Sequence, residues 1–174
     1  MAKVKIAKQH WGYIIPTLLL IAGGIFLFYK SGYISKGTVS GGYKSYGYYA
    51  AGKKSDDLDV RNIRWHQHNG YERLVFDIYK WDGVLGSLYM RTNETGLYQI
   101  GREKGNSKTI DGELSGYRAF SADMPSFAKS KIMQSMEIYP NDDGTFLFAI
   151  TLKKDASYKV FTLKNPARII IDAR

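Results

Sequence analysis

Apolar and polar residues alternate through much of the chain after residue 58. The clearest case is the run RLVFDIY at 73–79, in which every second residue is apolar and large. Successive side chains of a β-strand point to opposite faces, so Leu74, Phe76 and Ile78 would share one face. This pattern predicts a half-buried β-strand, with those three side chains in the core.

Turn signals separate the strand-like runs. Asn69-Gly70 stands between 59–65 and 73–79, and Asn-Gly is a strong signal for a two-residue hairpin. Similar pairs of runs are 129–140 and 145–154 around NDDG at 141–144, and 157–164 and 169–172 around NPAR at 165–168. Shorter strand candidates are 87–92 and 96–101, and 122–130 is the one candidate for a helical turn. Many short strands at this spacing predict a mainly β protein, with a small antiparallel β-sandwich over 58–174.

A different pattern comes before this domain. Residues 11–29, WGYIIPTLLLIAGGIFLFY, contain no charge and carry aromatic residues at both ends. As a helix they would cover about 28 Å, close to the hydrocarbon thickness of a bilayer. Bulky residues and Lys30 follow instead of a small-residue cleavage site, which favours an uncleaved signal anchor over a signal peptide. Gly23 and Gly24 would allow close packing of a second helix, although such glycines are also ordinary in membrane helices.

The basic residues lie mostly before residue 56. The chain has 25 Lys and Arg against 16 Asp and Glu, which gives a net charge of +9. Residues 1–55 hold eight lysines and no acid, so 56–174 hold 25 − 8 = 17 basic residues against 16 acidic ones. A nucleic-acid-binding domain would concentrate positive charge on its folded part, so we expect membrane lipid as a partner and no nucleic acid.

Lysines around the apolar segment also indicate its orientation. Lys3, Lys5 and Lys8 lie in the tail 1–10, ahead of the segment, and fewer lysines follow it closely. The positive-inside rule then keeps the N-terminus in the cytoplasm and places the C-terminal domain outside it. We therefore expect a single-pass protein of the inner (cytoplasmic) membrane whose C-terminal domain is periplasmic or extracytoplasmic.

Residues 30–57 are rich in Gly, Ser, Lys and Tyr and show no apolar period. They read as a linker, either a flexible spacer or a segment that becomes ordered on a protein partner. Tyrosine provides a large contact area at low entropic cost, which favours the second interpretation. The candidates for packing against a partner are Gly23 and Gly24 in the membrane and Tyr43, Tyr46, Tyr48 and Tyr49 in the linker.

The sequence offers no set of residues that would carry catalysis. There is no cysteine, and no phosphate-binding loop, dinucleotide fingerprint or nucleophile elbow occurs. His66 and His68 would face the same side of a strand, but a zinc site needs three or four ligands. We expect His68 to support the turn and Glu72 and Arg73 to be exposed there. Glu72 and Asp77 could be taken for a catalytic carboxylate pair, but solvent-facing charges are the favoured interpretation, and we expect no enzyme, no cofactor and no metal.

Two stretches at the ends of the domain resemble the signatures of AMIN-like domains, a β-sandwich class of bacterial envelope proteins. NIRWHQHNGYERLVFDI at 62–78 is similar to their opening strand pair, and YKVFTLKNPARIIIDAR at 158–174 to their closing pair. The first match rests on Arg64, His68, Gly70, Tyr71, Glu72, Arg73, Val75 and Phe76. The second rests on Tyr158, Phe161, Leu163, Asn165, Pro166, Arg168, Ile171 and Asp172. Glu72 stands where the family more usually has aspartate, and residues 84–140 match no part of the pattern.

The resemblance implies a module that localises envelope machinery, with peptidoglycan binding as the usual inference for the family. Exposed aromatic rings would stack on sugars and arginines would pair with peptide carboxylates. The candidates are Trp65, Tyr71, Arg73, Trp81, Tyr117 and Arg118. For Trp65 and Trp81, packing within the domain is the favoured alternative. A second hypothesis is a single-span accessory or structural subunit of a larger inner-membrane complex, and a cell-wall hydrolase ranks last.

Overall fold

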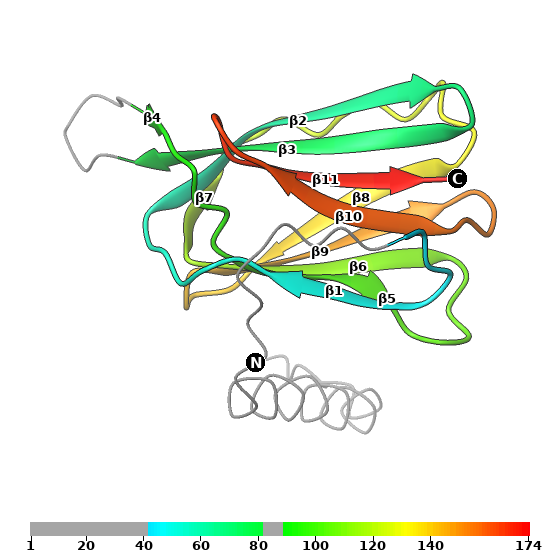
Figure 1. Ribbon diagram of the computed structural model, residues 1–174, viewed down its shortest axis with the longest axis horizontal. Helices are drawn as coiled ribbons and strands as arrows, with labels where there is room; N and C mark the ends of the chain where they lie inside the picture. The colour runs from blue at the N-terminus through cyan, green and yellow to red at the C-terminus, as the bar shows by residue number, and fades with distance from the viewer. Residues whose placement is uncertain (1–41, 82–88) are drawn as a thin grey trace, which may run out of the picture. The chain divides into compact units, whose positions relative to one another are not determined.

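The computed structural model describes residues 42–81 and 89–174 (Figure 1). These residues are mainly β, and none of them forms an α-helix. No helix that could span a membrane occurs in this described part. The tail 1–10, the apolar segment 11–29 with Gly23 and Gly24, and linker residues 30–41 lie outside it.

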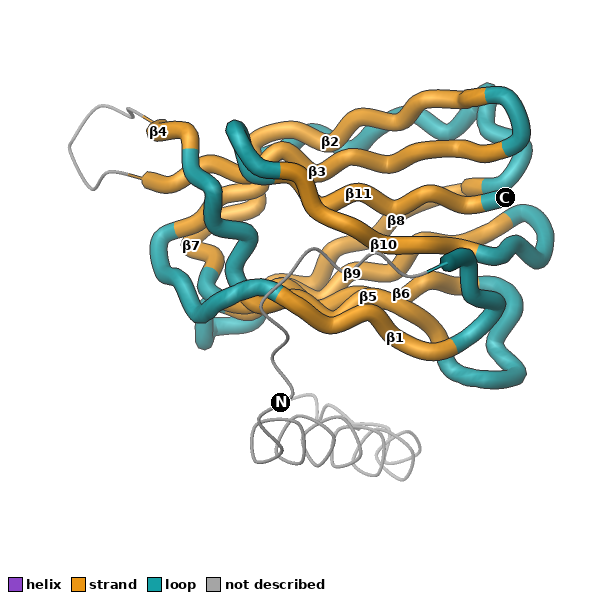
Figure 2. The backbone as a smooth tube through the Cα atoms, viewed as in Figure 1, coloured by secondary structure: helices purple, strands orange, loops and turns teal. Residues whose placement is uncertain are grey.

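The described strands form two sheets (Figure 2). Sheet B has the order β1-β5-β6-β9-β8, and its members are Gly47–Ala51, Leu97–Arg102, Thr109–Ser115, Thr145–Leu152 and Met133–Pro140. Sheet A has the order β10-β11-β3-β2-β7, and its members are Tyr158–Leu163, Arg168–Ala173, Tyr71–Trp81, Leu58–His68 and Tyr117–Phe120. The short strand β4 (Tyr89–Arg91) pairs with the end of β3.

All described pairings in sheet B are antiparallel, whereas sheet A is mixed. Strand β7 runs parallel to the first residues of β2. The prediction of a mainly β fold is therefore confirmed, while the prediction of purely antiparallel pairing is wrong at this edge. The strand run at 117–120 has only four residues, too few for its pairing direction to be read from periodicity.

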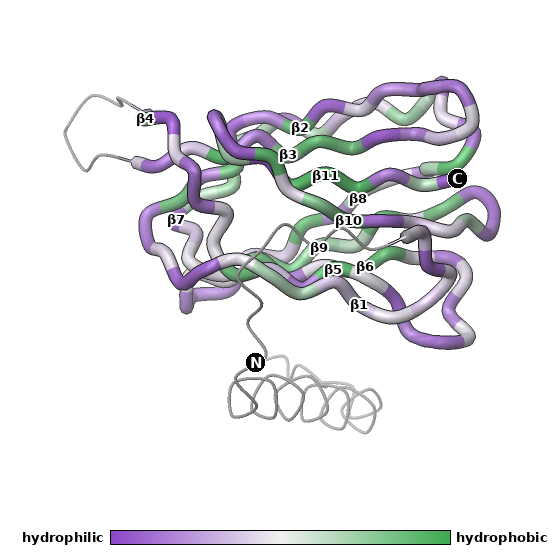
Figure 3. The backbone as a smooth tube through the Cα atoms, viewed as in Figure 1, coloured by the Kyte–Doolittle hydropathy of each residue, from purple (hydrophilic) through white to green (hydrophobic). Residues whose placement is uncertain are grey.

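The inner faces of the two sheets share one hydrophobic core. Leu74, Phe76 and Ile78 of β3 are buried there, as their alternation predicted. The ring of Phe76 lies 5.3 Å, centroid to centroid, from that of Phe148 on β9 of the opposite sheet. Figure 3 shows apolar stretches along the strands and polar stretches at the turns. Burial of aliphatic and aromatic surface between the sheets is the main stabilising contribution.

The three predicted hairpins are confirmed. Strands β2 and β3 are joined by Asn69-Gly70, and Gly70 has a φ of 84°, the left-handed conformation such a turn requires. Strands β8 and β9 pair around residues 141–144, and β10 and β11 around the cis Asn165-Pro166 bond. Residues 122–130 contain turns but no helix, so the candidate helical turn there is not formed.

The predicted linker extends too far. Strand β1 lies inside it and pairs residue by residue with β5, from Gly47 opposite Arg102 to Ala51 opposite Tyr98. Further upstream, the backbones of Lys44 and Tyr158 exchange two hydrogen bonds of 2.7 and 2.8 Å. The domain therefore starts well before residue 58, because an edge strand of Gly, Tyr and Ala lacks the apolar alternation that marks the central strands.

Candidate functional site

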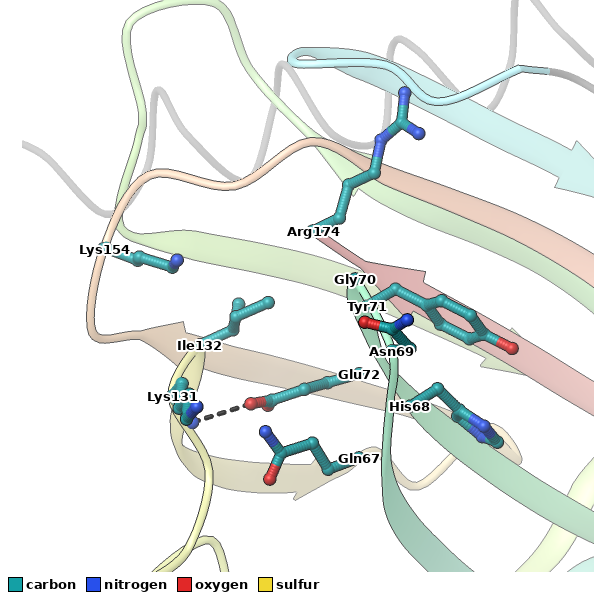
Figure 4. Close-up of a pocket in the computed structure, with 10 residues that line it drawn as sticks. All are labelled: Gln67, His68, Asn69, Gly70, Tyr71, Glu72, Lys131, Ile132, Lys154 and Arg174. Carbon is teal, nitrogen blue, oxygen red and sulfur yellow. Dashed lines mark hydrogen bonds between the residues drawn. The ribbon is translucent and has the colours of Figure 1, made fainter.

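A depression of about 520 Å³ lies at the turn between β2 and β3 (Figure 4). We call it the turn depression. Three further chain segments reach it: the residues before β8, the residues after β9 and the end of β11. Its lining residues are Gln67, His68, Asn69, Gly70, Tyr71, Glu72, Lys131, Ile132, Lys154 and Arg174. The Asn-Gly turn places the exposed ends of two strands at one edge of the depression.

The turn depression is basic. Lys131, Lys154 and Arg174 are exposed, and none of them forms an ion pair with a carboxylate of the described side chains. Each comes from a different segment, so only the folded topology places the three residues around one depression. Three cations around one concave surface attract carboxylate or phosphate groups.

Among the lining side chains, Glu72 carries the one carboxylate, and hydrogen bonds within the domain hold it. It is buried, and its oxygens accept hydrogen bonds from the Ser130 hydroxyl, the Lys131 backbone N–H at 2.6 Å and the Trp65 indole N–H at 3.2 Å. Burial alone would raise the pKa of Glu72, but these hydrogen bonds outweigh it and lower the pKa below 4.5. The prediction that Glu72 is exposed is wrong, since its side chain points to the inner side of sheet A.

Tyr71 and Arg73 are brought together at this end of β3. The Tyr71 ring stacks on His68 with the centroids 4.7 Å apart, and the Arg73 guanidinium carbon lies 5.3 Å from the Tyr71 centroid. His68 thus supports Tyr71 through its ring. Arg73 also forms two hydrogen bonds with Asp172, so it fixes this surface and keeps little capacity for a new carboxylate.

Tyr43, a candidate from the predicted linker, lies beside the same region. The Arg174 guanidinium carbon is 3.9 Å from the centre of its ring, and the Lys159 ammonium is 5.1 Å from it. Burial raises the pKa of Tyr43. The ring therefore holds Arg174 in place at the rim through a cation–π contact.

Trp81 and Arg118 form a pair at the opposite end of the sheet. The guanidinium carbon of Arg118 lies 3.4 Å from the Trp81 ring centroid, and Asp57 lies 3.9 Å from the same guanidinium. Ten steps of about 3.3 Å along β3 put this pair roughly 33 Å from Tyr71. The two groups of candidates cannot form one small site.

The remaining candidates divide between core and surface. Tyr117 and Tyr49 are both 1 % exposed, so neither is available to a ligand or partner. Trp65 is half-buried and packs edge-on against Phe127, as the packing alternative predicted. Tyr46 and Tyr48 are exposed, at 56 % and 38 %.

The possible catalytic carboxylate pair is not formed. Asp77 lies on the outer face of sheet A, where Arg64 donates two hydrogen bonds of 2.8 Å to it, whereas Glu72 points inward. Asp77 is 8 % exposed, so the prediction of a solvent-facing charge is also wrong here. Among the described residues, no three His, Cys, Asp or Glu side chains lie close enough together to hold a metal ion.

Comparisons with protein-family models, with curated proteins and with solved structures gave no match for this chain.

Reasoning from sequence missed three residues of the turn depression, namely Lys131, Lys154 and Arg174. Lysines at strand ends are common, and no spacing along the chain indicates that these three converge. The depression follows from the arrangement of the strands.

Proposed function

We propose that this chain is a membrane-anchored binding module of the bacterial cell envelope, whose turn depression contacts the carboxylates of peptidoglycan. The observation that carries this proposal is that Lys131, Lys154 and Arg174, without ion-pair partners among the described side chains, line one depression together with Tyr71. Ammonium and guanidinium groups form strong charge-assisted hydrogen bonds with carboxylates. A tyrosine ring offers a flat surface on which a sugar can pack.

The resemblance to AMIN-like domains supports the same proposal. Arg73 belongs to the first matched stretch and Asp172 to the second, and the two residues pair across β3 and β11. The two ends of the matched region thus form one continuous part of sheet A. The module has no catalytic role in this proposal, and it holds its envelope partner by binding alone.

Membrane attachment and topology are part of the proposal. The uncharged segment 11–29 would act as the anchor, with the N-terminus in the cytoplasm and the β-domain on the other side. Protease treatment of spheroplasts tests this directly. We expect protease added to intact spheroplasts to digest the β-domain. Full protection of the domain until the membrane is lysed would refute the topology.

Binding to peptidoglycan is tested by co-sedimentation of the full chain, in mild detergent, with purified sacculi. The double variant Lys131→Ala/Lys154→Ala is expected to reduce the bound fraction several-fold. The matched control is Lys53→Ala/Lys54→Ala, which removes two exposed lysines away from the turn depression.

The chemistry of the contact has its own test. Amidation of the sacculus carboxylates removes their charge, so binding of the unchanged chain should fall by a similar factor. Equal sedimentation of both lysine variants, or full binding to amidated sacculi, would overturn the proposal.

A further inference from the structure

The segment predicted as the linker joins the folded domain beside the turn depression, at Tyr43. The residue before it, Gly42, accepts a hydrogen bond on its carbonyl from the hydroxyl of the buried Tyr49. The residue after it, Lys44, exchanges two backbone hydrogen bonds of 2.7 and 2.8 Å with Tyr158. These two anchor points fix the backbone on either side of the Tyr43 ring, which is half-buried.

Arg174 lines the turn depression, but its guanidinium is held outside it. The guanidinium carbon lies 3.9 Å from the centre of the Tyr43 ring. Figure 4 shows the Arg174 side chain directed away from Lys131 and Lys154, toward the segment that leads into β1. The backbone of Arg174 is fixed by two hydrogen bonds with Ser157, of 2.8 and 2.9 Å. The depression therefore has at its rim a third cation that does not point into it.

Arg174 differs from the other cations near this surface. The Lys159 ammonium lies 5.1 Å from the centre of the Tyr43 ring and 3.4 Å from the carboxylate of Asp172. Arg73 donates two hydrogen bonds to the same carboxylate. Arg174 forms no ion pair with any carboxylate in the described part of the chain. It is thus the cation of this group that can leave its position without breaking an ion pair.

We propose that Tyr43 regulates the turn depression by holding the Arg174 guanidinium outside it, and that displacement of the linker releases Arg174 to bind the ligand. This inference rests on the proposed function, because it concerns the same site. Rotation between staggered rotamers redirects a long side chain without moving its backbone. A released guanidinium would offer a carboxylate two parallel hydrogen bonds, which the ammonium groups of Lys131 and Lys154 do not provide.

The two anchor points set the direction of this control. Gly42 is held by one hydrogen bond to a side chain, whereas Lys44 is held by two to the backbone. A pull on the linker from the membrane side would therefore free Gly42 and withdraw Tyr43 while the rest of the domain stays folded. The module would then hold its ligand more tightly when the linker is under tension.

The strength of the ring contact sets the size of the effect. An exposed cation–π contact favours the stacked position of the guanidinium by roughly two- to fivefold. The fraction of molecules with Arg174 unstacked is then about one third to one sixth. Release of Arg174 should therefore tighten ligand binding by about three- to sixfold.

The test measures binding of the full chain, in mild detergent, to a fluorescent peptide that alternates glutamate with threonine, followed by anisotropy. The eight lysines of residues 1–55 also attract this peptide, so the share of the depression is the binding lost in Lys131→Ala/Lys154→Ala. For this share, Tyr43→Ala should lower the dissociation constant by about three- to sixfold. A merely structural role of Tyr43 would have the opposite sign, because a damaged domain binds more weakly.

Three further variants isolate the contact. Tyr43→Phe keeps the face of the ring and should restore the wild-type dissociation constant. In the Arg174→Ala background, Tyr43→Ala should have no effect, since no guanidinium remains to be released. The matched control Tyr46→Ala removes an exposed tyrosine three residues further on and should leave binding unchanged.

The peptide decides this inference, and purified sacculi, measured in parallel, decide the proposed function. Unchanged or weaker peptide binding in Tyr43→Ala would overturn the inference. Equal tightening in the Arg174→Ala background, or peptide binding that does not depend on Lys131 and Lys154, would overturn it as well. If the peptide shows the Tyr43 effect while sacculi do not bind, the proposed function fails and the control of the depression by Tyr43 stands.

Discussion

Arg73 on β3 and Asp172 on β11 are 99 residues apart in sequence and form a two-pronged ion pair, with N–O distances of 2.7 and 2.9 Å. They stand opposite each other in the register of the two strands. Lys159 on β10 approaches the same carboxylate at 3.4 Å. Because Asp172 is fully buried, its charge depends on these two cations, and three neighbouring strands are tied together at one point.

Substitution of Arg73 should therefore lower the free energy of unfolding more than the loss of a surface ion pair does. We expect Arg73→Ala to lower the free energy of unfolding by about 2–4 kcal/mol, because the buried carboxylate of Asp172 loses its two-pronged partner and keeps only the Lys159 ammonium at 3.4 Å. The variant Arg73→Met/Asp172→Leu should lose much less, since no buried charge remains. Urea denaturation of Arg73→Ala and of the double variant compares the two losses of unfolding free energy. A cost below about 0.5 kcal/mol for Arg73→Ala would contradict this expectation.

Glu72 should give the domain an acid-sensitive stability. Its pKa is lowered in the folded state, so its stabilising contribution is complete above the ordinary value of 4.5 and is lost as the pH falls through the folded value. We expect Glu72→Gln to cost about 1–3 kcal/mol at neutral pH, because the amide cannot replace the carboxylate toward the Ser130 hydroxyl and two N–H donors.

Thermal unfolding of both proteins between neutral and acidic pH checks this. The difference between wild type and Glu72→Gln should shrink on acidification. A difference that stays constant down to pH values well below 4.5 would show that the carboxylate charge is not what matters.

Those parts of the fold that follow from local chemistry could be predicted from the sequence. Asn69-Gly70 specifies a hairpin turn, and the alternation around Phe76 specifies which face enters the core. The burial of Glu72 could not be predicted, because its hydrogen-bond donor Ser130 lies 58 residues away. A charge beside a turn is usually solvated, and only the tertiary contact reverses that expectation.

Strand β1 and the turn depression were missed for related reasons. The sequence around Tyr49 is dominated by Gly, Tyr and Ala, and its pairing partner β5 supplies the specificity. The cations of the turn depression flank strands that are far apart in the sequence. Lys131 precedes β8, Lys154 follows β9 and Arg174 follows β11. Spatial convergence of strand ends depends on sheet order, which periodicity does not encode.

Tyr49 should be essential to the domain although it lies in the predicted linker. Its ring is 1 % exposed and packs edge-on against Tyr158, and its hydroxyl donates to the carbonyl of Gly42. We expect Tyr49→Ala to lower the free energy of unfolding by about 3–5 kcal/mol, whereas the exposed Tyr46→Ala should change it by less than about 0.5 kcal/mol. Small and equal losses of unfolding free energy for the two variants, measured by chemical denaturation, would contradict this prediction and support a linker.

Arg102 should be the most sensitive cation of the domain. It is 1 % exposed, and its guanidinium donates to the carbonyls of Ser45, Ser107 and Ala156 and, at 2.9 Å, to Asp155. We expect Arg102→Ala to cost about 3–5 kcal/mol, because it leaves a cavity in place of a buried side chain and because the buried carbonyl of Ala156 and two part-buried carbonyls lose their donor.

Arg102→Lys should restore only part of this loss, since an ammonium cannot reproduce the planar fork. The control Asp155→Ala removes only the exposed partner and should cost less than about 1 kcal/mol. Denaturant midpoints rank the three variants, and a ranking with Asp155→Ala as the most damaging would contradict this account.

Asp111 should be a site at which removal of a charge stabilises the protein. Burial raises its pKa in the folded state above the ordinary value of 3.8, so the ionised form is disfavoured by folding. The penalty is fully present above the folded pKa and disappears as the pH falls below 3.8, the unfolded value. Asp111→Asn should therefore raise the free energy of unfolding at neutral pH, by less than about 1 kcal/mol because the side chain is only half-buried.

The advantage of Asp111→Asn over wild type should vanish in acid, whereas Asp142→Asn, at an exposed loop position, should show no comparable gain at any pH. Thermal unfolding across the acidic range measures both variants. An asparagine variant that is less stable at neutral pH would instead assign Asp111 a structural role toward Thr109, whose hydroxyl donates to its carboxylate.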